Sequence, residues 1–136
     1  DLVARAADGW NTCWAWTPDA YRDRLAVLDA ACARHDRDPA SVWRTLGLYT
    51  LVGENDADLR ARFARLQHSS PPGIKTLSDF DTFREGRLVG TVEQVRDQIG
   101  QWESLGVDTI VCGFGAVPFQ VGPVDELEML AEAARP

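Results

Sequence analysis

The chain has 136 residues, 45% hydrophobic and 26% charged, values that are typical of one soluble globular domain. Its net charge of −7 disfavours a nucleic-acid surface, because such surfaces are basic. No apolar run approaches the roughly 20 residues of a membrane span. Three widely spaced cysteines predict buried free thiols in a reducing compartment and no metal site: Cys13, Cys32 and Cys112. We therefore expect a cytoplasmic protein without a nucleic-acid or membrane partner.

The first part of the chain reads as a helix end, a strand and a helix. Residues 1–7 have no cap and predict the last turns of a helix that starts upstream. The aromatic run 10–16 favours a strand. Thr17-Pro18-Asp19 is a typical helix start. The helix that follows carries an apolar stripe with helical spacing: Tyr21, Leu25, Leu28 and Cys32.

The middle of the chain repeats this order. Residues 41–52 are crowded with apolar side chains and predict a strand buried on both faces. The next helix has an apolar face formed by Leu59, Phe63 and Leu66. Its arginines are expected to point to solvent: Arg60, Arg62 and Arg65. Residues 69–90 predict an irregular insertion or loop, and a connection of this length in a compact domain is usually functional.

The last part predicts a third unit. Thr91 with Gln94 forms a capping box for a helix that Gly106 ends. Residues 107–112 are the clearest strand, and Gly113-Phe114-Gly115 follows it. In the final helix we expect four side chains to point inward: Val124, Leu127, Leu130 and Ala131.

Strands that alternate with helices predict an α/β fold with a parallel sheet and outer helices. About three such units are too few for a closed (β/α)8 barrel, which needs eight units and about 250 residues. We therefore interpret residues 1–136 as one C-terminal segment of a larger TIM barrel or layered sheet. Much of any active site is then expected to lie upstream of Asp1.

Three stretches resemble one known family. Ala6-Ala7-Asp8-Gly9-Trp10-Asn11 is similar to the "aaADGWN" stretch of the luciferase-like monooxygenases. His35-Asp36-Arg37-Asp38-Pro39 resembles their "GRDP" turn, although relatives often carry Gly where this chain has His35. Gly90-Thr91-Val92-Glu93-Gln94-Val95, with Leu105-Gly106-Val107-Asp108, resembles their "GTPEQV…LGVD" segment. The three stretches occur in the family's order.

The resemblance implies a (β/α)8 barrel that binds FMN or the deazaflavin coenzyme F-420. It implies a monooxygenase, reductase or dehydrogenase that acts on a small organic molecule, and family members are often homodimers. The wording of the matching stretches leans towards F-420. The family's phosphate-binding strand end and its main ring contacts precede the ADGW stretch, so the catalytic residues stay unknown, and this segment alone is expected to be inactive.

Ligands of such barrels meet the C-terminal ends of the strands. We therefore expect cofactor- or substrate-binding residues in three places. Trp10, Asn11 and Trp14 follow the ADG stretch, Lys75 and Arg84 lie in the 69–90 insertion, and Phe114 follows the last strand. The aromatic residues can wall a ring pocket, and arginine matches carboxylate or phosphate. Core packing for the tryptophans, solvation for the two cations and a simple turn around Phe114 are the alternatives.

Two other functions are compatible with the sequence. The chain can be a non-catalytic barrel fragment or accessory domain that pairs with a partner chain, because an unfinished sheet exposes apolar edges. A flavin-independent aldolase is disfavoured, since the single lysine, Lys75, lies in a loop and not at a strand end.

Overall fold

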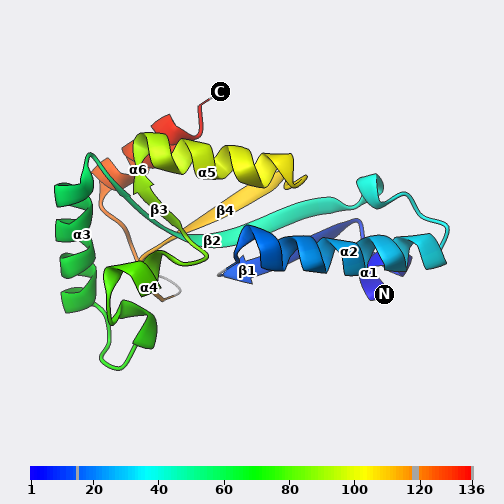
Figure 1. Cartoon of the computed structure of the whole chain (residues 1–136), viewed down its shortest axis with the longest axis horizontal. Coiled ribbons are helices and arrows are strands. Elements are labelled where there is room, and N and C mark those ends of the chain that lie inside the picture. Colours follow the sequence, from blue (N-terminus) through cyan, green and yellow to red (C-terminus); the bar gives the residue numbers. More distant parts are fainter. Residues whose placement is uncertain (15, 118–119, 136) are drawn as a thin grey trace.

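A parallel sheet forms the centre of the molecule in the computed structural model, which describes residues 1–14, 16–117 and 120–135 (Figure 1). Its strands are β1 (Gly9–Trp14), β2 (Trp43–Gly53), β3 (Leu88–Thr91) and β4 (Thr109–Phe114). The predicted strands at 10–16, 41–52 and 107–112 are thus confirmed as elements, with ends shifted by one or two residues. Residue 15 of the first predicted run lies outside the described residues.

The long strand β2 holds the sheet together. Its residues 45–50 pair in register with β4, from Thr45 opposite Thr109 to Thr50 opposite Phe114. The opposite edge of β2 is shared, because β1 pairs with residues 43–48 and β3 pairs with residues 50–53. All of these pairs are parallel, as the alternation of strands and helices predicts.

Helices connect the strands and begin where the sequence places their caps. They are α1 (Leu2–Ala6), α2 (Pro18–Arg34), α3 (Asp56–Ser69), α4 (Phe80–Arg84), α5 (Val92–Ser104) and α6 (Val124–Ala133). Thr17 caps α2 by accepting from the Ala20 N–H, and Thr91 and Gln94 form both bonds of the capping box of α5. Gly106, with φ of +77°, ends the α5 turn as predicted.

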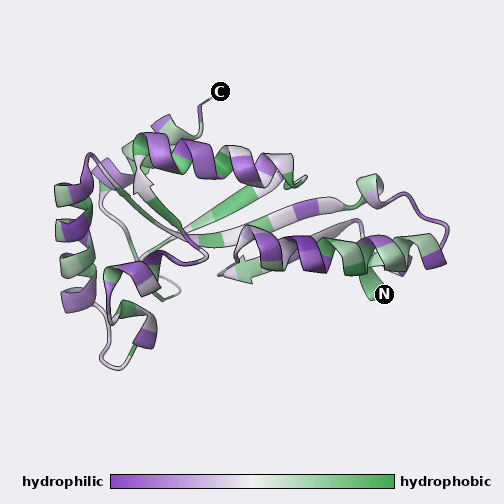
Figure 2. Ribbon diagram, in the orientation of Figure 1, coloured by the Kyte–Doolittle hydropathy of each residue, from purple (hydrophilic) through white to green (hydrophobic). Residues whose placement is uncertain are grey.

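The two faces of β2 are covered differently. Leu46, Leu48 and Val52 pack in clusters with residues of α2, α5 and α6, so these helices cover one face. On the other face Leu51 packs with residues of α3 and α4 and with Val89 of β3. Apolar residues accordingly concentrate on the strands and on one side of the longer helices (Figure 2). The helix α3 and the 69–90 segment therefore cover the second face only at its C-terminal end.

The 69–90 segment is more ordered than the sequence suggests. It contains a 3-10 turn (Lys75–Leu77), the helix α4 and the first residues of β3. The short elements were not predicted, because elements of three to five residues carry too little periodicity to be recognised, and irregular stretches connect them. Leu77 and Phe83 are buried in the cluster around Leu51, which fixes the segment on the sheet.

Several burial predictions also need correction. Arg62 is buried at 7% exposure and does not point to solvent, whereas Val124, Leu127 and Ala131 are exposed on α6. The buried positions of that helix are Glu126, Leu130 and Ala133. Cys13 is exposed, although Cys32 is buried as expected. No helix within the described ranges is long and apolar enough to cross a membrane.

Candidate functional site

One face of the sheet is left partly open, and its residues follow from the strand register. Asn11 lies beside Thr45 and Cys13 beside Gly47, while Thr45 in turn lies beside Thr109 and Gly47 beside Val111. Side chains of paired residues in parallel strands point to the same face. Asn11, Cys13 and Val111 are exposed there. Trp14 stands opposite Leu48 in the register, but its ring stacks on Tyr49 and lies against Gly47, so its side chain lies on this face too. We call this set of residues, with Tyr49 and Trp14, the open face.

A stacked aromatic pair lies near the C-terminal ends of the strands on the open face. The rings of Trp14 and Tyr49 are 5.3 Å apart between centroids, with an interplanar angle of 29°. Glycines make room for them. A Cβ on Gly47 would lie 2.9 Å from Cys13 Cβ and 3.1 Å from the Trp14 ring, and one on Gly113 would lie 3.3 Å from that ring. Trp14 keeps 38% of its surface exposed, so one side of the pair remains accessible.

Hydrogen-bonding groups surround the aromatic pair. The Thr45 hydroxyl donates to Asn11 Oδ1 at 2.8 Å, and the exposed Asn11 amide N–H groups have no partner among the described residues, so they can donate to a ligand. Burial raises the pKa of the Tyr49 phenol, with Arg87 opposing the shift, so the phenol stays protonated and can donate at neutral pH. The face thus combines an aromatic surface with neutral donors.

Arg87 supplies a fixed cation within electrostatic range of Tyr49. Its Nη1 donates to the carbonyls of Phe83 at 2.7 Å and Glu85 at 3.0 Å, and its guanidinium lies 5.0 Å above the Phe83 ring. Burial lowers the pKa of Arg87, but arginine remains charged at physiological pH. Sequence analysis missed Arg87 and Tyr49. The alternation of Thr45, Gly47 and Tyr49 with leucines was the available signal for Tyr49.

The structure brings together only two of the six predicted site residues. Asn11 and Trp14 both lie on the open face. Trp10 lies on the other face, where its ring stacks on the buried Tyr21 of α2 at 5.5 Å. Phe114 packs against the cluster formed by Val52, Val95, Leu130 and Ala133. Both remain candidate binding residues only as predictions.

The two predicted cations of the insertion are both exposed. Lys75 is exposed on the 3-10 turn. Arg84 is exposed at the end of α4, with its guanidinium 5.9 Å from the Phe80 ring. Neither makes an ion pair with a described residue. No group of His, Cys, Asp or Glu in the described part of the chain is arranged to hold a metal ion.

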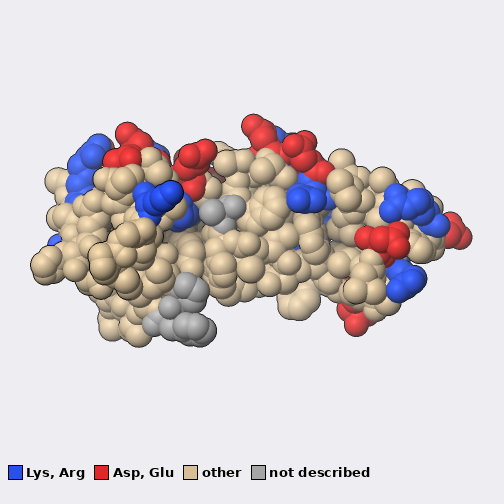
Figure 3. All heavy atoms as spheres, turned by 90° about the horizontal axis from the view of Figure 1, so that it is seen from below, with Lys and Arg blue, Asp and Glu red and all other residues tan. Residues whose placement is uncertain are grey.

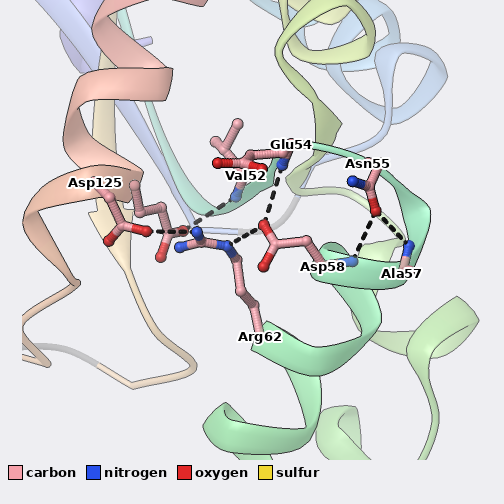
Figure 4. Close-up of polar contacts among 8 residues, drawn as sticks. Val52, Glu54, Asn55, Ala57, Asp58, Arg62 and Asp125 are labelled. Atoms are coloured by element: carbon pink, nitrogen blue, oxygen red, sulfur yellow. Dashed lines mark hydrogen bonds and ion pairs between the residues drawn. The ribbon is translucent and has the colours of Figure 1, made fainter.

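A charge network centred on the buried Arg62 lies where β2 and β4 end (Figure 4). Arg62 of α3 donates through Nε to Asp58 at 2.7 Å and through Nη2 to Asp125 of α6 at 2.5 Å. Burial alone would lower the pKa of Arg62, but these bonds raise it above its ordinary value. The bonds to Arg62 also hold the pKa values of Asp58 and Asp125 below their usual range.

Glu126 completes this network. Its Oε1 accepts from the Val52 N–H at 3.1 Å, and only 3% of the residue is exposed. Burial raises the pKa of the Glu126 carboxyl to about 7, although the Val52 N–H and Arg62 oppose the shift. A carboxyl that titrates near neutrality can give or take a proton. Sequence analysis did not single out Glu126, because one acid on a helix rich in acids carries no pattern.

Comparison with known proteins supports the fold. In solved structures, the chain is similar to EDTA monooxygenase (EmoA) from Chelativorans sp. BNC1, with 17% identity and a TM-score of 0.69 over 97% of this chain and 42% of that one. It is also similar to coenzyme F-420-dependent tetrahydromethanopterin reductase from Methanopyrus kandleri, with 13% identity and a TM-score of 0.67 over 94% and 44%. An F-420-dependent secondary alcohol dehydrogenase is similar as well, with 15% identity and a TM-score of 0.67 over 99% of this chain and 45% of that one.

These likenesses show that the chain has the fold of part of a (β/α)8 barrel, as expected from the sequence. The chain spans less than half the length of each of these three proteins. No curated protein sequence matches it. The sequence profile of the luciferase-like monooxygenases, however, matches residues 1–109. Because that match covers most of the chain, the protein belongs to the luciferase-like monooxygenase family.

Proposed function

We propose that the chain is part of an oxidoreductase that uses FMN or coenzyme F-420 on a small organic substrate, and that the open face forms one wall of its cofactor or substrate pocket. The observation that carries the proposal is the accessible Trp14–Tyr49 pair at the C-terminal ends of parallel strands, in a member of this family. That end of the strands is where (β/α)8 barrels bind their ligands.

The residues of the open face fit the flat ring of such a cofactor. Trp14 offers an aromatic surface with 38% exposure, and stacked aromatic groups attract one another beyond simple burial. The Asn11 amide and the protonated Tyr49 phenol offer donors to ring carbonyl groups. Arg87 adds a positive charge that favours an electron-rich ring or an anionic substrate.

When bound, a flavin or deazaflavin supplies the hydride or electron chemistry, and the protein supplies binding, orientation and exclusion of water. Trp14 and Tyr49 orient the ring and keep water from one of its sides. Asn11 and Tyr49 donate hydrogen bonds to the ring. Because both donors are neutral, these bonds persist over the physiological pH range. The chain needs no protein nucleophile for this role.

Titration of the intact protein with FMN and with F-420 tests the proposal. We expect one of the two to bind, and Trp14→Ala to weaken it by about tenfold or more, since aromatic stacking on a base-like ring contributes about 1–3 kcal/mol. Trp10→Phe is the matched control, because Trp10 lies on the covered face, and it should leave cofactor affinity within about twofold. Binding of neither cofactor contradicts the proposal, and FMN binding alone contradicts the lean towards F-420.

An accessory domain that pairs with a partner chain is the alternative function. Exposed large apolar side chains support it, among them Trp43 at 58% and Val111 at 48%. Figure 3 shows charged side chains gathered along one edge and at one end, with a wide uncharged area between them. Such a domain would form a stable complex without binding either cofactor, so size-exclusion chromatography with the same titrations distinguishes the two functions. Together with the oxidoreductase function, we propose that the protein is a homodimer and lies in the cytoplasm.

A further inference from the structure

A hollow of about 200 Å³ lies between α3 and the start of α6, beyond the C-terminal ends of β2 and β4. Its apolar lining includes Leu51, Leu66 and Pro123. Its charged lining consists of Arg62, Arg65 and Glu126. The hollow is distinct from the aromatic pair, since neither Trp14 nor Tyr49 lines it. Its volume is below the roughly 300–1,000 Å³ of sites for drug-sized ligands, which limits any occupant to a small molecule.

Two of the charged side chains at the hollow have unused hydrogen-bonding atoms. Glu126 Oε1 accepts from the Val52 N–H, but Oε2 has no partner among the described residues. Arg62 uses Nε and Nη2 to bind Asp58 and Asp125, whereas its buried Nη1 has no partner within the described part of the chain. A buried charged donor without a partner costs free energy, so a ligand that satisfies it is favoured.

The charges that line the hollow favour an anion. Arg65 is an exposed cation that can turn to a ligand at the rim. Arg62 is already paired with Asp58 and Asp125, so it contributes its unpartnered Nη1 as a donor and not an unpaired charge. The single acid of the lining is Glu126, whose pKa burial raises to about 7, so it is half protonated near neutrality. Asp58 of α3 and Asp125 of α6 also act on Glu126, but neither lines the hollow.

We propose that this hollow binds a small organic anion, an apolar body that ends in a carboxylate. The apolar part packs on Leu51 and Leu66, and the carboxylate meets Arg65 and Arg62. The protonated form of Glu126 donates through its free oxygen to the same carboxylate, in a short charge-assisted hydrogen bond. Binding therefore takes up a proton. This inference does not depend on the proposed oxidoreductase function, because it concerns other residues and needs no cofactor.

Calorimetric titration of the intact protein with sodium hexanoate tests the site, with hexan-1-ol and hexylamine as probes of the same length. We expect hexanoate to bind at least about tenfold more tightly than either, because hydrogen bonds to charged groups are the strong ones. Its affinity should rise about tenfold from pH 8 to pH 6, as the protonated fraction of a group with a pKa near 7 rises by that factor. Preferential binding of hexylamine would overturn the proposal.

Matched variants locate the site. Arg65→Gln should weaken hexanoate binding about tenfold, whereas Arg60→Gln should not change it, since Arg60 lies on the same helix but outside the hollow, 5.1 Å from the Phe80 ring. Glu126→Gln keeps an acceptor for Val52 and a donor for the ligand, so binding should persist and vary less than about twofold between pH 6 and pH 8. Equal losses of hexanoate affinity in both arginine variants, or an unchanged pH dependence of binding in E126Q, would refute the proposed anion site. Circular dichroism checks that each variant is folded.

Discussion

The Glu126 side chain takes the place of a strand beside Val52. The β2–β4 ladder ends at Thr50 opposite Phe114, and Gly115, with φ of +89°, turns the chain away. The Val52 N–H would then lack a partner two residues beyond the ladder. Glu126 Oε1 accepts from it at 3.1 Å. A carboxyl from α6 thus completes the backbone pairing of the sheet, and it is buried to do so.

This position makes the stability of the protein depend on pH. The folded pKa of Glu126 is about 7, above its ordinary value of 4.5, so the folded state holds the proton more strongly than the unfolded state. Stability from this group is fully present below pH 4.5 and is lost as the pH rises towards 7. The loss amounts to about 3 kcal/mol.

Glu126→Gln should abolish this dependence, because glutamine keeps an acceptor for Val52 and cannot ionise. We expect the free energy of unfolding of E126Q relative to wild type to increase by about 3 kcal/mol between pH 4 and pH 8. Urea denaturation followed by tryptophan fluorescence at several pH values measures it. A constant difference across this range would mean that folding does not shift the pKa of Glu126.

Arg62 should be the most costly arginine to remove from α3. It is 7% exposed and binds carboxylates on two helices, whereas Arg60 on the same helix is exposed. Arg62→Met should destabilise the protein by about 2–3 kcal/mol, at the lower end for buried pairs because the two carboxylates reach water. Arg60→Met should cost less than about 0.5 kcal/mol. Similar losses in both variants would show that the ion pairs at Arg62 add nothing to stability.

The contrast between Arg60 and Arg62 also shows where sequence reasoning stops. Helical spacing correctly predicts that Leu59, Phe63 and Leu66 are buried. The same spacing places Arg62 at the margin of that face. Whether such a residue is solvated depends on what α6 brings to it, and Asp125 is 63 residues away in the chain. No local pattern contains that information.

Caps and strands could be predicted well because their causes are local. Thr17, Thr91 and Gly106 act within a few residues of themselves, and all three are confirmed. The candidate site could be predicted only in part. Asn11 and Trp14 share a face, but the partner of Trp14 is Tyr49 on the neighbouring strand. That contact joins two neighbouring strands, and the sequence does not show how the side chains of one strand lie against the other.

Gly100 offers a test of helix propensity without contact effects. It lies within α5, and a Cβ added there meets nothing within 4 Å. Gly100→Ala should therefore stabilise the protein by about 0.5–1 kcal/mol, because alanine loses less backbone entropy in a helix. Thermal unfolding measures the gain. No gain would indicate that this part of α5 is frayed in solution. Gly90→Ala is the opposite case, since its Cβ would lie 2.7 Å from Gln94, and it should destabilise.

Gly47 connects the packing of the open face to the proposed function. A methyl group at this position would lie 2.9 Å from Cys13 Cβ and 3.1 Å from the Trp14 ring, so Gly47→Ala must displace the indole from Tyr49. We expect a loss of about 1–3 kcal/mol in stability from overpacking. Affinity for FMN or F-420 should fall about tenfold, as for removal of the stacking surface. A Cβ on Gly113 would lie 3.3 Å from the Trp14 ring and 3.4 Å from the Tyr49 ring, so Gly113→Ala should lower stability and affinity by smaller amounts. Cofactor titration of folded G47A and G113A protein tests whether the affinity loss is larger in G47A. Unchanged affinity in G47A would show that the aromatic pair does not bind the cofactor.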